Sequence, residues 1–176
     1  MIGPPLSETV KKLVGEHNSM GIDLVMQNFK KYYDSKGCKS SKVYPGVNNM
    51  LNLLFSKGVT LYLATNKRFL PTQKIIELLG WSQIFKSIYA IDKYVDRPFA
   101  NKTEMLSKLL NLELIDPSDT VYIGDRMEDF EAAHSNNLAA ILVQWGYGDL
   151  GSIDKKLMQT VSSADELTAE IMDFRK

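Results

Sequence analysis

The chain has 176 residues, of which 44% are hydrophobic and 24% are charged, the composition of an ordinary globular protein with a sizeable core. Its 21 basic and 21 acidic residues cancel, so charge gives no reason to expect binding to nucleic acid or to an anionic membrane. Cys38 is the one cysteine, which excludes an intrachain disulfide. The sequence has neither a secretory leader pattern nor an apolar run of about 18 residues, and therefore predicts a cytoplasmic protein.

The first forty residues carry helical patterns. Residues 7–15 and 20–35 are predicted helices because their apolar side chains recur at roughly helical spacing. A polar stretch at residues 39–42 predicts a linker. We therefore expect a small helical unit at residues 1–42 and a separate core at residues 43–176.

From residue 43 onwards the predicted elements alternate. The predicted helices cover residues 44–55, 71–79, 102–112, 127–135 and 164–174, and the predicted strands cover residues 59–64, 87–91, 120–123 and 139–143. This alternation indicates crossover units, and so a Rossmann-like α/β fold with a parallel sheet covered by helices on both faces. Ligands of such sheets bind beyond the carboxyl ends of the strands.

Polar residues that suit phosphate chemistry stand at those strand ends. Thr65 and Asn66 follow the first predicted strand, Asp125 and Asp129 follow the third, and Lys102 begins a helix between them. A hydroxyl with neighbouring N–H groups can hold phosphate oxygens, and a lysine adds a fixed positive charge. Two aspartates one helical turn apart can hold Mg²⁺ directly or through water. The sequence predicts that these groups converge on one crevice.

Each of these elements also has a purely structural interpretation. Thr65 and Asn66 could form a strand-end turn or a helix cap, and Lys102 could be a solvated surface lysine. Asp125 could cap the helix that follows it. The order and spacing of all three elements together favour the site.

The same segments resemble motifs of the haloacid dehalogenase superfamily, and within it the phosphoglycolate-phosphatase-like members. Leu63-Ala64-Thr65-Asn66-Lys67 is similar to the second motif of that family, Lys102 to the lysine of the third, and residues 121–129 to the acidic fourth motif. Tyr44-Pro45-Gly46-Val47 resembles the return from cap to core, and Trp145-Gly146-Tyr147-Gly148 resembles the loop after the next strand.

The resemblance implies a magnesium-dependent phosphatase acting on a small phosphorylated metabolite, with residues 1–42 as part of a helical cap. Thr65 and the backbone of Asn66 would bind the phosphoryl group, and Lys102 would steady the phosphate and the nucleophile. Asp125 would bind Mg²⁺, and Asp129 would support the ion from behind or through water. Arg126 and Glu128 face the same crevice and could touch the substrate.

The first motif of the family is missing. That motif is Asp-x-Asp followed by Gly and by Thr or Ser, and its two aspartates act as nucleophile and as general acid and base. The sequence contains no such pattern. Asp23 lacks a second carboxylate two residues later, and Asp34 lies at a helix end, so neither replaces it.

The missing motif lies on a central strand of the family fold, so its absence predicts two neighbouring strands with unpaired backbone groups. A strand from another chain, a homo-oligomer contact, a rearranged sheet or a water-filled groove could fill the interval. The chain is then either a truncated phosphatase or a non-catalytic module that keeps affinity for Mg²⁺ or phosphate.

Other assignments are weaker. A receiver domain would carry its acidic pair near the N-terminus, and a dinucleotide-binding domain would carry Gly-x-Gly-x-x-Gly after a strand; this sequence shows neither. His17, His134 and Cys38 have no companions at useful spacing, and we assign them no role.

Overall fold

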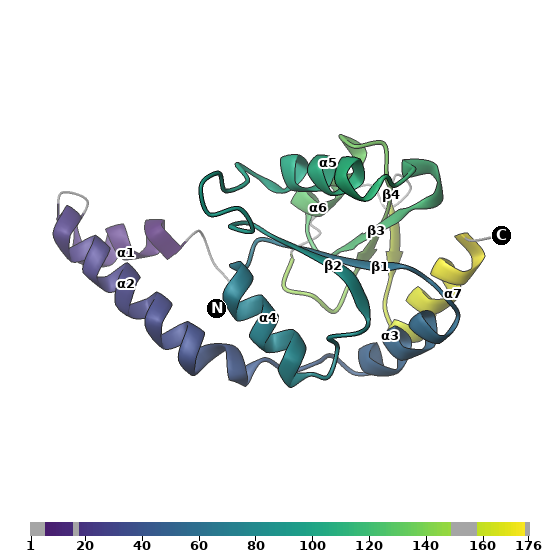
Figure 1. The fold of residues 1–176 in the computed structure, drawn as a ribbon, viewed down its shortest axis with the longest axis horizontal. Coiled ribbons are helices and arrows are strands. Elements are labelled where there is room, and N and C mark those ends of the chain that lie inside the picture. The colour runs from purple at the N-terminus through teal and green to yellow at the C-terminus, as the bar shows by residue number, and fades with distance from the viewer. Residues whose placement is uncertain (1–5, 16–17, 149–157, 175–176) are drawn as a thin grey trace.

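The computed structural model describes residues 6–15, 18–148 and 158–174, and these form an α/β fold (Figure 1). The helices are α1 (Leu6–Val14), α2 (Ser19–Ser35), α3 (Val47–Ser56), α4 (Phe69–Leu78), α5 (Lys102–Glu113), α6 (Met127–His134) and α7 (Ala164–Phe174), with short 3₁₀ turns η1 (Gly37–Ser40) and η2 (Pro117–Asp119). The strands are β1 (Leu61–Thr65), β2 (Phe85–Ala90), β3 (Val121–Gly124), β4 (Ala139–Val143) and β5 (Gln159–Val161).

All strand pairings among the described residues are parallel. β1 pairs with β2, from Leu61 opposite Phe85 to Thr65 opposite Ala90. β3 pairs with β4, and β4 pairs with β5. The predicted parallel α/β fold is therefore confirmed, with one strand more than the sequence suggested, because β5 has only three residues and too short a pattern to stand out.

Two apolar layers sandwich the strands. One layer is centred on Leu54 of α3, Leu167 and Ile171 of α7 and Ile141 of β4. The other joins α5 to α6 through Leu106, Leu110, Ala132, Ala133 and Leu138. Figure 1 shows α5 and α6 on one side of the strands and α3 and α7 on the other. Helices on both faces are what a buried parallel sheet requires.

The sheet is divided in two. Among the described residues β1 and β3 form no backbone ladder with each other, so the order is β2–β1 on one side and β3–β4–β5 on the other. Both strands nevertheless contribute to the same layers, since Leu61 and Ile123 pack against the α3–α7 cluster and Ala64 and Tyr122 against the α5–α6 cluster. Every residue of β1 and β3 stays half-buried, whereas Ile141 and Leu142 of β4 are buried.

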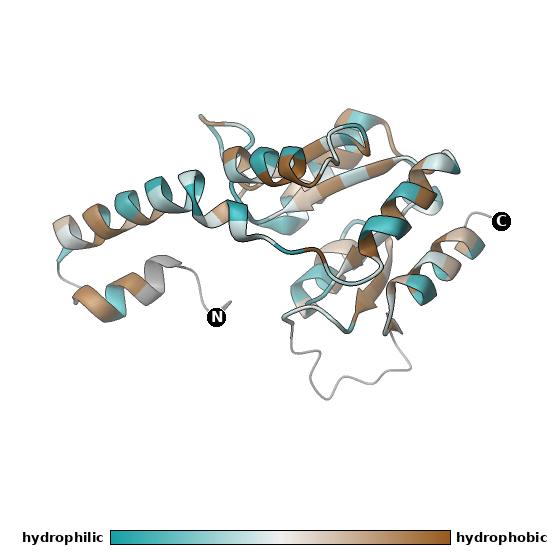
Figure 2. Ribbon diagram, turned by 90° about the horizontal axis from the view of Figure 1, so that it is seen from below, coloured by the Kyte–Doolittle hydropathy of each residue, from teal (hydrophilic) through white to brown (hydrophobic). Residues whose placement is uncertain are grey.

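The helices α1 and α2 lie side by side and extend away from the strands (Figure 2). They are tied to the core near residue 34, where the Asp34 carboxylate accepts two N–H bonds from the Arg68 guanidinium. Lys74 of α4 donates to the Asp34 carbonyl oxygen at 2.8 Å. The thiol of Cys38, which directly precedes the predicted linker at residues 39–42, is fully buried at this junction. The division at residue 42 stays a prediction.

No helix in residues 6–15, 18–148 or 158–174 combines the length and the apolar character needed to cross a bilayer.

Candidate active site

The polar residues singled out by sequence lie where β1, β3 and two helix N-termini meet. Lys102 begins α5, and Asp129 lies in the first turn of α6. The Lys102 ammonium and the Asp129 carboxylate are in direct contact, although 27 residues separate them in sequence. Because α5 follows β2 and α6 follows β3, this contact links the segment after β2 to the carboxyl end of β3. The predicted convergence of Lys102 with the acidic pair is therefore seen in the structure.

Asp129 is the most enclosed acidic group of this cluster, with only 2% of the residue exposed. Its Oδ1 accepts from Lys102, and its Oδ2 accepts the backbone N–H groups of Asp125 and Arg126 at 2.9 and 3.0 Å. Protein donors thus reach both carboxylate oxygens. Hydrogen bonds and a cation compensate the burial of this charge.

Asp125 follows β3 directly and is held from the loop after β4. Its Oδ2 accepts the backbone N–H of Tyr147 at 2.8 Å and that of Gly148 at 3.2 Å. Its Oδ1 has no hydrogen-bond partner among the residues that the structure describes. One oxygen of Asp125 therefore fixes the side chain, and the other makes no hydrogen bond to the described residues.

Three glycines surround the two aspartates. A Cβ atom at Gly124 would stand 2.6 Å from Asp129 Oδ2, and one at Gly146 would stand 2.6 Å from the Asp125 carboxyl carbon. A Cβ atom at Gly148 would come within 2.7 Å of the Asp125 carbonyl carbon. Real Cβ contacts are essentially never this short, so these positions have no room for a side chain.

Thr65 ends β1 and turns its hydroxyl toward its own loop. Its Oγ1 accepts the backbone N–H of Lys67 at 3.1 Å, which is the strand-end turn considered from sequence. Asn66 is exposed. The structure thus gives Thr65 a local structural contact, and its role toward phosphate stays a prediction.

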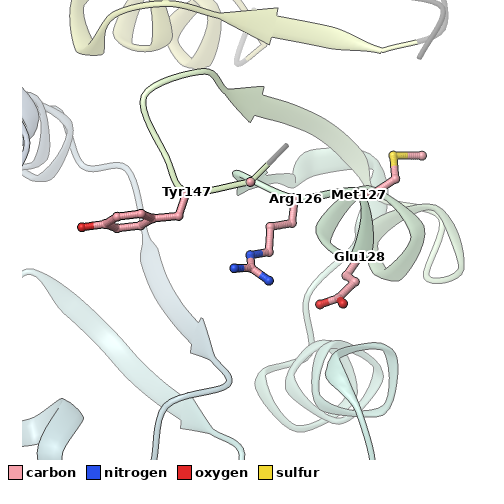
Figure 3. A pocket seen from close by; sticks show the side chains of 5 residues that line it. Arg126, Met127, Glu128 and Tyr147 are labelled. Carbon is pink, nitrogen blue, oxygen red and sulfur yellow. The ribbon is translucent and has the colours of Figure 1, made fainter. Parts of the chain in front are cut away.

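A shallow polar hollow of about 230 Å³ opens beside Asp125. Its lining comes from Arg126, Met127 and Glu128 at the start of α6 and from Tyr147 and Gly148 of the loop after β4 (Figure 3). In Figure 3 the Arg126 guanidinium lies between the Tyr147 ring and the Glu128 carboxylate. The sequence placed Arg126 and Glu128 at the crevice but assigned no role to Tyr147, Gly146 or Gly148. The only signal for these three was the Trp-Gly-Tyr-Gly segment.

Tyr122 lies behind the acidic pair, on the face of β3 that packs against α6. Burial, together with the charge of the Asp129 carboxylate and a hydrogen bond to it, raises the pKa of the Tyr122 phenol above its ordinary value. The phenol is therefore neutral and donates toward Asp129.

We expect Tyr122 to make the fold sensitive to alkali. Above pH 10 the unfolded tyrosine loses its proton while the folded one keeps it, so the free energy of unfolding falls by about 1.4 kcal/mol per pH unit for this group. Urea unfolding should show that the free energy of unfolding falls less between pH 8 and pH 11 in Tyr122→Phe than in the wild type. Tyr32→Phe, which alters an exposed tyrosine, should lose as much free energy of unfolding over this pH range as the wild type does. Equal slopes of the free energy of unfolding against pH in all three proteins would contradict this prediction.

The acidic residues at this site could supply only part of the ligand set of a magnesium ion. Mg²⁺ takes few carboxylates and several waters, and Asp125 Oδ1 is suitable as one such ligand. Both oxygens of Asp129 already serve protein donors. No group of three or more acidic, histidine or cysteine residues that could hold a metal occurs within the described part of the chain. The described residues could offer such an ion one carboxylate oxygen, Asp125 Oδ1, and a role of Asp129 in metal binding stays a prediction.

Comparison with known proteins identifies the family. A family profile described as haloacid dehalogenase-like hydrolase matches residues 1–143, more than three quarters of the chain. The chain belongs to the haloacid dehalogenase-like hydrolases. The resemblance based on the strand-end motifs is thereby confirmed, including its phosphoglycolate-phosphatase-like character.

The chain is similar to curated proteins named as a 5'-nucleotidase and as a phosphoglycolate phosphatase. A 5'-nucleotidase from Pseudomonas aeruginosa is 29% identical over 147 residues, which is 84% of this chain and 65% of the relative. A phosphoglycolate phosphatase from Psychrobacter arcticus is 32% identical over 136 residues, 76% of this chain and 57% of the relative. The chain thus spans about three fifths of the length of these relatives.

The fold agrees with the family. The crystal structure of a predicted phosphatase from Clostridium acetobutylicum superimposes with a TM-score of 0.81 at 26% identity, covering 97% of this chain and 78% of the other. Agreement over nearly the whole chain includes the helices before residue 42 as well as the α/β core.

Proposed function

We propose that this chain provides the phosphate-binding and metal-binding part of a magnesium-dependent phosphomonoester hydrolase. The observation that supports this most strongly is the contact between Lys102 and Asp129, which brings a cation and the acidic motif together at the strand ends. The names of the two relatives, a 5'-nucleotidase and a phosphoglycolate phosphatase, support a small phosphorylated metabolite as substrate, with phosphoglycolate as one candidate.

Each residue has a defined task in this proposal. The Thr65 hydroxyl and the backbone N–H of Asn66 bind phosphoryl oxygens. Lys102, held by Asp129, places a positive charge beside them, where it stabilises the charge that spreads over these oxygens during transfer. Asp125 binds Mg²⁺ through Oδ1, and the bound ion supplies further charge neutralisation. The loop at residues 146–148 keeps Asp125 in place.

The attacking group is not among these residues. Covalent phosphoryl transfer needs a nucleophile, and the sequence has no Asp-x-Asp pattern. We infer that hydrolysis requires a carboxylate on a segment outside these 176 residues. Without such a segment the chain acts as a module that binds Mg²⁺ and phosphate, and this is the alternative function.

The proposal is tested first by Mg²⁺ binding. Isothermal titration calorimetry of the wild-type chain should detect Mg²⁺ binding, and Asp125→Asn should weaken it by about tenfold or more because the direct ligand oxygen is lost. Glu128→Gln is the matched control, since it removes an exposed carboxylate from the next turn of the same segment. Equal affinities for the wild type and Asp125→Asn, or an equal loss in Glu128→Gln, would overturn the assignment of Asp125.

A further inference from the structure

The loop between β1 and α4 carries Thr65 and Asn66, the two residues that the proposed function assigns to phosphate. Arg68 at the end of this loop is the N-cap residue of α4 and makes no side-chain hydrogen bond to the helix. A guanidinium has only donors, so it cannot accept the free N–H groups of a helix N-terminus. The Arg68 side chain instead donates to Asp34 near the end of α2. An acceptor for the first N–H of α4 therefore has to come from another element.

The segment that follows β2 supplies this acceptor. Asp92 Oδ1 accepts the backbone N–H of Phe69, the first residue of α4, at 2.6 Å. The preceding residue, Ile91, donates its backbone N–H to the Lys67 carbonyl oxygen at 3.3 Å. Two successive residues after β2 therefore bond to the β1–α4 loop on either side of Arg68. The bond to Asp92 is charge-assisted, because a carboxylate accepts it at the positive end of a helix.

The charge of Asp92 does not itself favour a phosphate. Thr65 lies opposite Ala90 in the β1–β2 ladder, so Asp92 and the β1–α4 loop lie at the same carboxyl end of the two strands. No cation of the described residues forms an ion pair with the Asp92 carboxylate. A carboxylate in this place repels a phosphate group. Any gain in phosphate affinity from Asp92 can therefore come only from the position that it gives to the loop.

We propose that Asp92 is a positioning residue for phosphate binding, which holds the β1–α4 loop so that the Thr65 hydroxyl and the Asn66 backbone N–H keep their places at the end of β1. This inference rests on the proposed function, because its effect is on the phosphate that Thr65 and Asn66 would bind. Asp92 acts through the Phe69 N–H and does not touch the phosphate. Asp125 is held by a different loop, the one after β4, so its Mg²⁺ binding does not depend on Asp92.

The test measures the affinity of the 176-residue chain for inorganic phosphate, by ³¹P NMR titration at saturating Mg²⁺. Asp92→Ala should weaken phosphate binding by about tenfold, because the Phe69 N–H loses its acceptor and the loop loses its position. Asp92→Asn should bind phosphate at least as tightly as the wild type, since the amide oxygen still accepts the N–H and the repelling charge is gone. Asp96→Ala is the matched control, because it removes an exposed carboxylate from the same loop and should not weaken binding.

Two further measurements separate positioning from a general loosening of the fold. Calorimetric titration with Mg²⁺ in the absence of phosphate should give the wild-type affinity for Asp92→Ala, whereas a loosened fold would lower both affinities. Hydrogen exchange should show that the Phe69 amide loses protection in Asp92→Ala and keeps it in Asp92→Asn. Rescue by asparagine would then assign the effect to the accepted N–H bond and not to the negative charge.

The possible failures can be told apart. Wild-type phosphate affinity in Asp92→Ala, or an equal loss in Asp92→Asn, would overturn the role of Asp92 and leave the proposed function standing. An equal loss of Mg²⁺ and phosphate affinity in Asp92→Ala would overturn it too, since the effect would then be a general one. If the wild type binds no phosphate at saturating Mg²⁺, the proposed function itself is wrong and the role of Asp92 falls with it.

Discussion

Asp129→Asn should lower the free energy of unfolding by about 3–5 kcal/mol, the cost typical of removing one member of a buried ion pair. The Lys102 and Asp129 side chains are 15% and 3% exposed, and Asp129 also accepts two backbone N–H bonds. An amide at position 129 would turn its NH₂ group toward either the ammonium or the N–H groups, so that one donor faces another. Urea unfolding at pH 7 measures the loss.

A double-mutant cycle separates the ion pair from its surroundings. Lys102→Met should lower the free energy of unfolding less than Asp129→Asn does, because the Asp129 carboxylate keeps its backbone donors and its neighbour Tyr122. The double variant Lys102→Met/Asp129→Asn should lose less than the sum of the single losses, because no charge is then left buried without its partner. Arg97→Met is the control. It breaks the exposed ion pair with Glu104 and should lower the free energy of unfolding by less than about 1 kcal/mol. Additive losses would contradict a coupled pair.

Gly148→Ala should weaken Mg²⁺ binding by at least about tenfold. The new methyl group would meet the backbone of Asp125, which cannot turn aside as a flexible side chain can. The loop must therefore move, and the N–H bonds from Tyr147 and Gly148 to Asp125 Oδ2 break. Overpacking of this kind also lowers the free energy of unfolding by about 1–3 kcal/mol.

Gly21→Ala provides a matched control for Gly148→Ala. Its methyl group would also make close contacts, but only with the Asn18 side chain at the start of α2, which can rotate away. Its Mg²⁺ affinity, measured by calorimetry, should equal that of the wild type. Wild-type affinity in Gly148→Ala would show that the loop does not position Asp125.

The sequence predicts the fold well where periodicity is long and regular. The alternation of apolar strands with amphipathic helices after residue 43 indicates a parallel α/β fold, and each of the four strands expected from it is present. β5 could not be recognised because three residues are too few to show a period. The burial of Cys38 was also missed, since its polar neighbours hide the tertiary contact with α4.

From the sequence, the part of the candidate site formed by side chains could be predicted, whereas the part formed by backbone N–H groups could not. Asp125, Asp129 and Lys102 are chemical types placed at strand and helix ends, so their convergence follows from topology. The contribution of Tyr147 and Gly148 consists of backbone N–H groups, which every residue except proline carries, so only the Trp-Gly-Tyr-Gly segment, and not the residue types themselves, pointed to this loop. For Thr65 the sequence allowed a strand-end turn, and the structure contains that turn, with the Lys67 N–H donating to the Thr65 hydroxyl oxygen.

We propose that these residues bind a phosphate ester together with Mg²⁺ but do not include the nucleophile that would cleave the ester. ³¹P NMR of p-nitrophenyl phosphate with the chain and Mg²⁺ tests both parts in one sample. We expect the ester resonance to broaden in the wild type and not in Asp125→Asn, and no inorganic phosphate to appear in either. Absence of broadening in the wild type, or release of phosphate that disappears in Asp125→Asn, would contradict it.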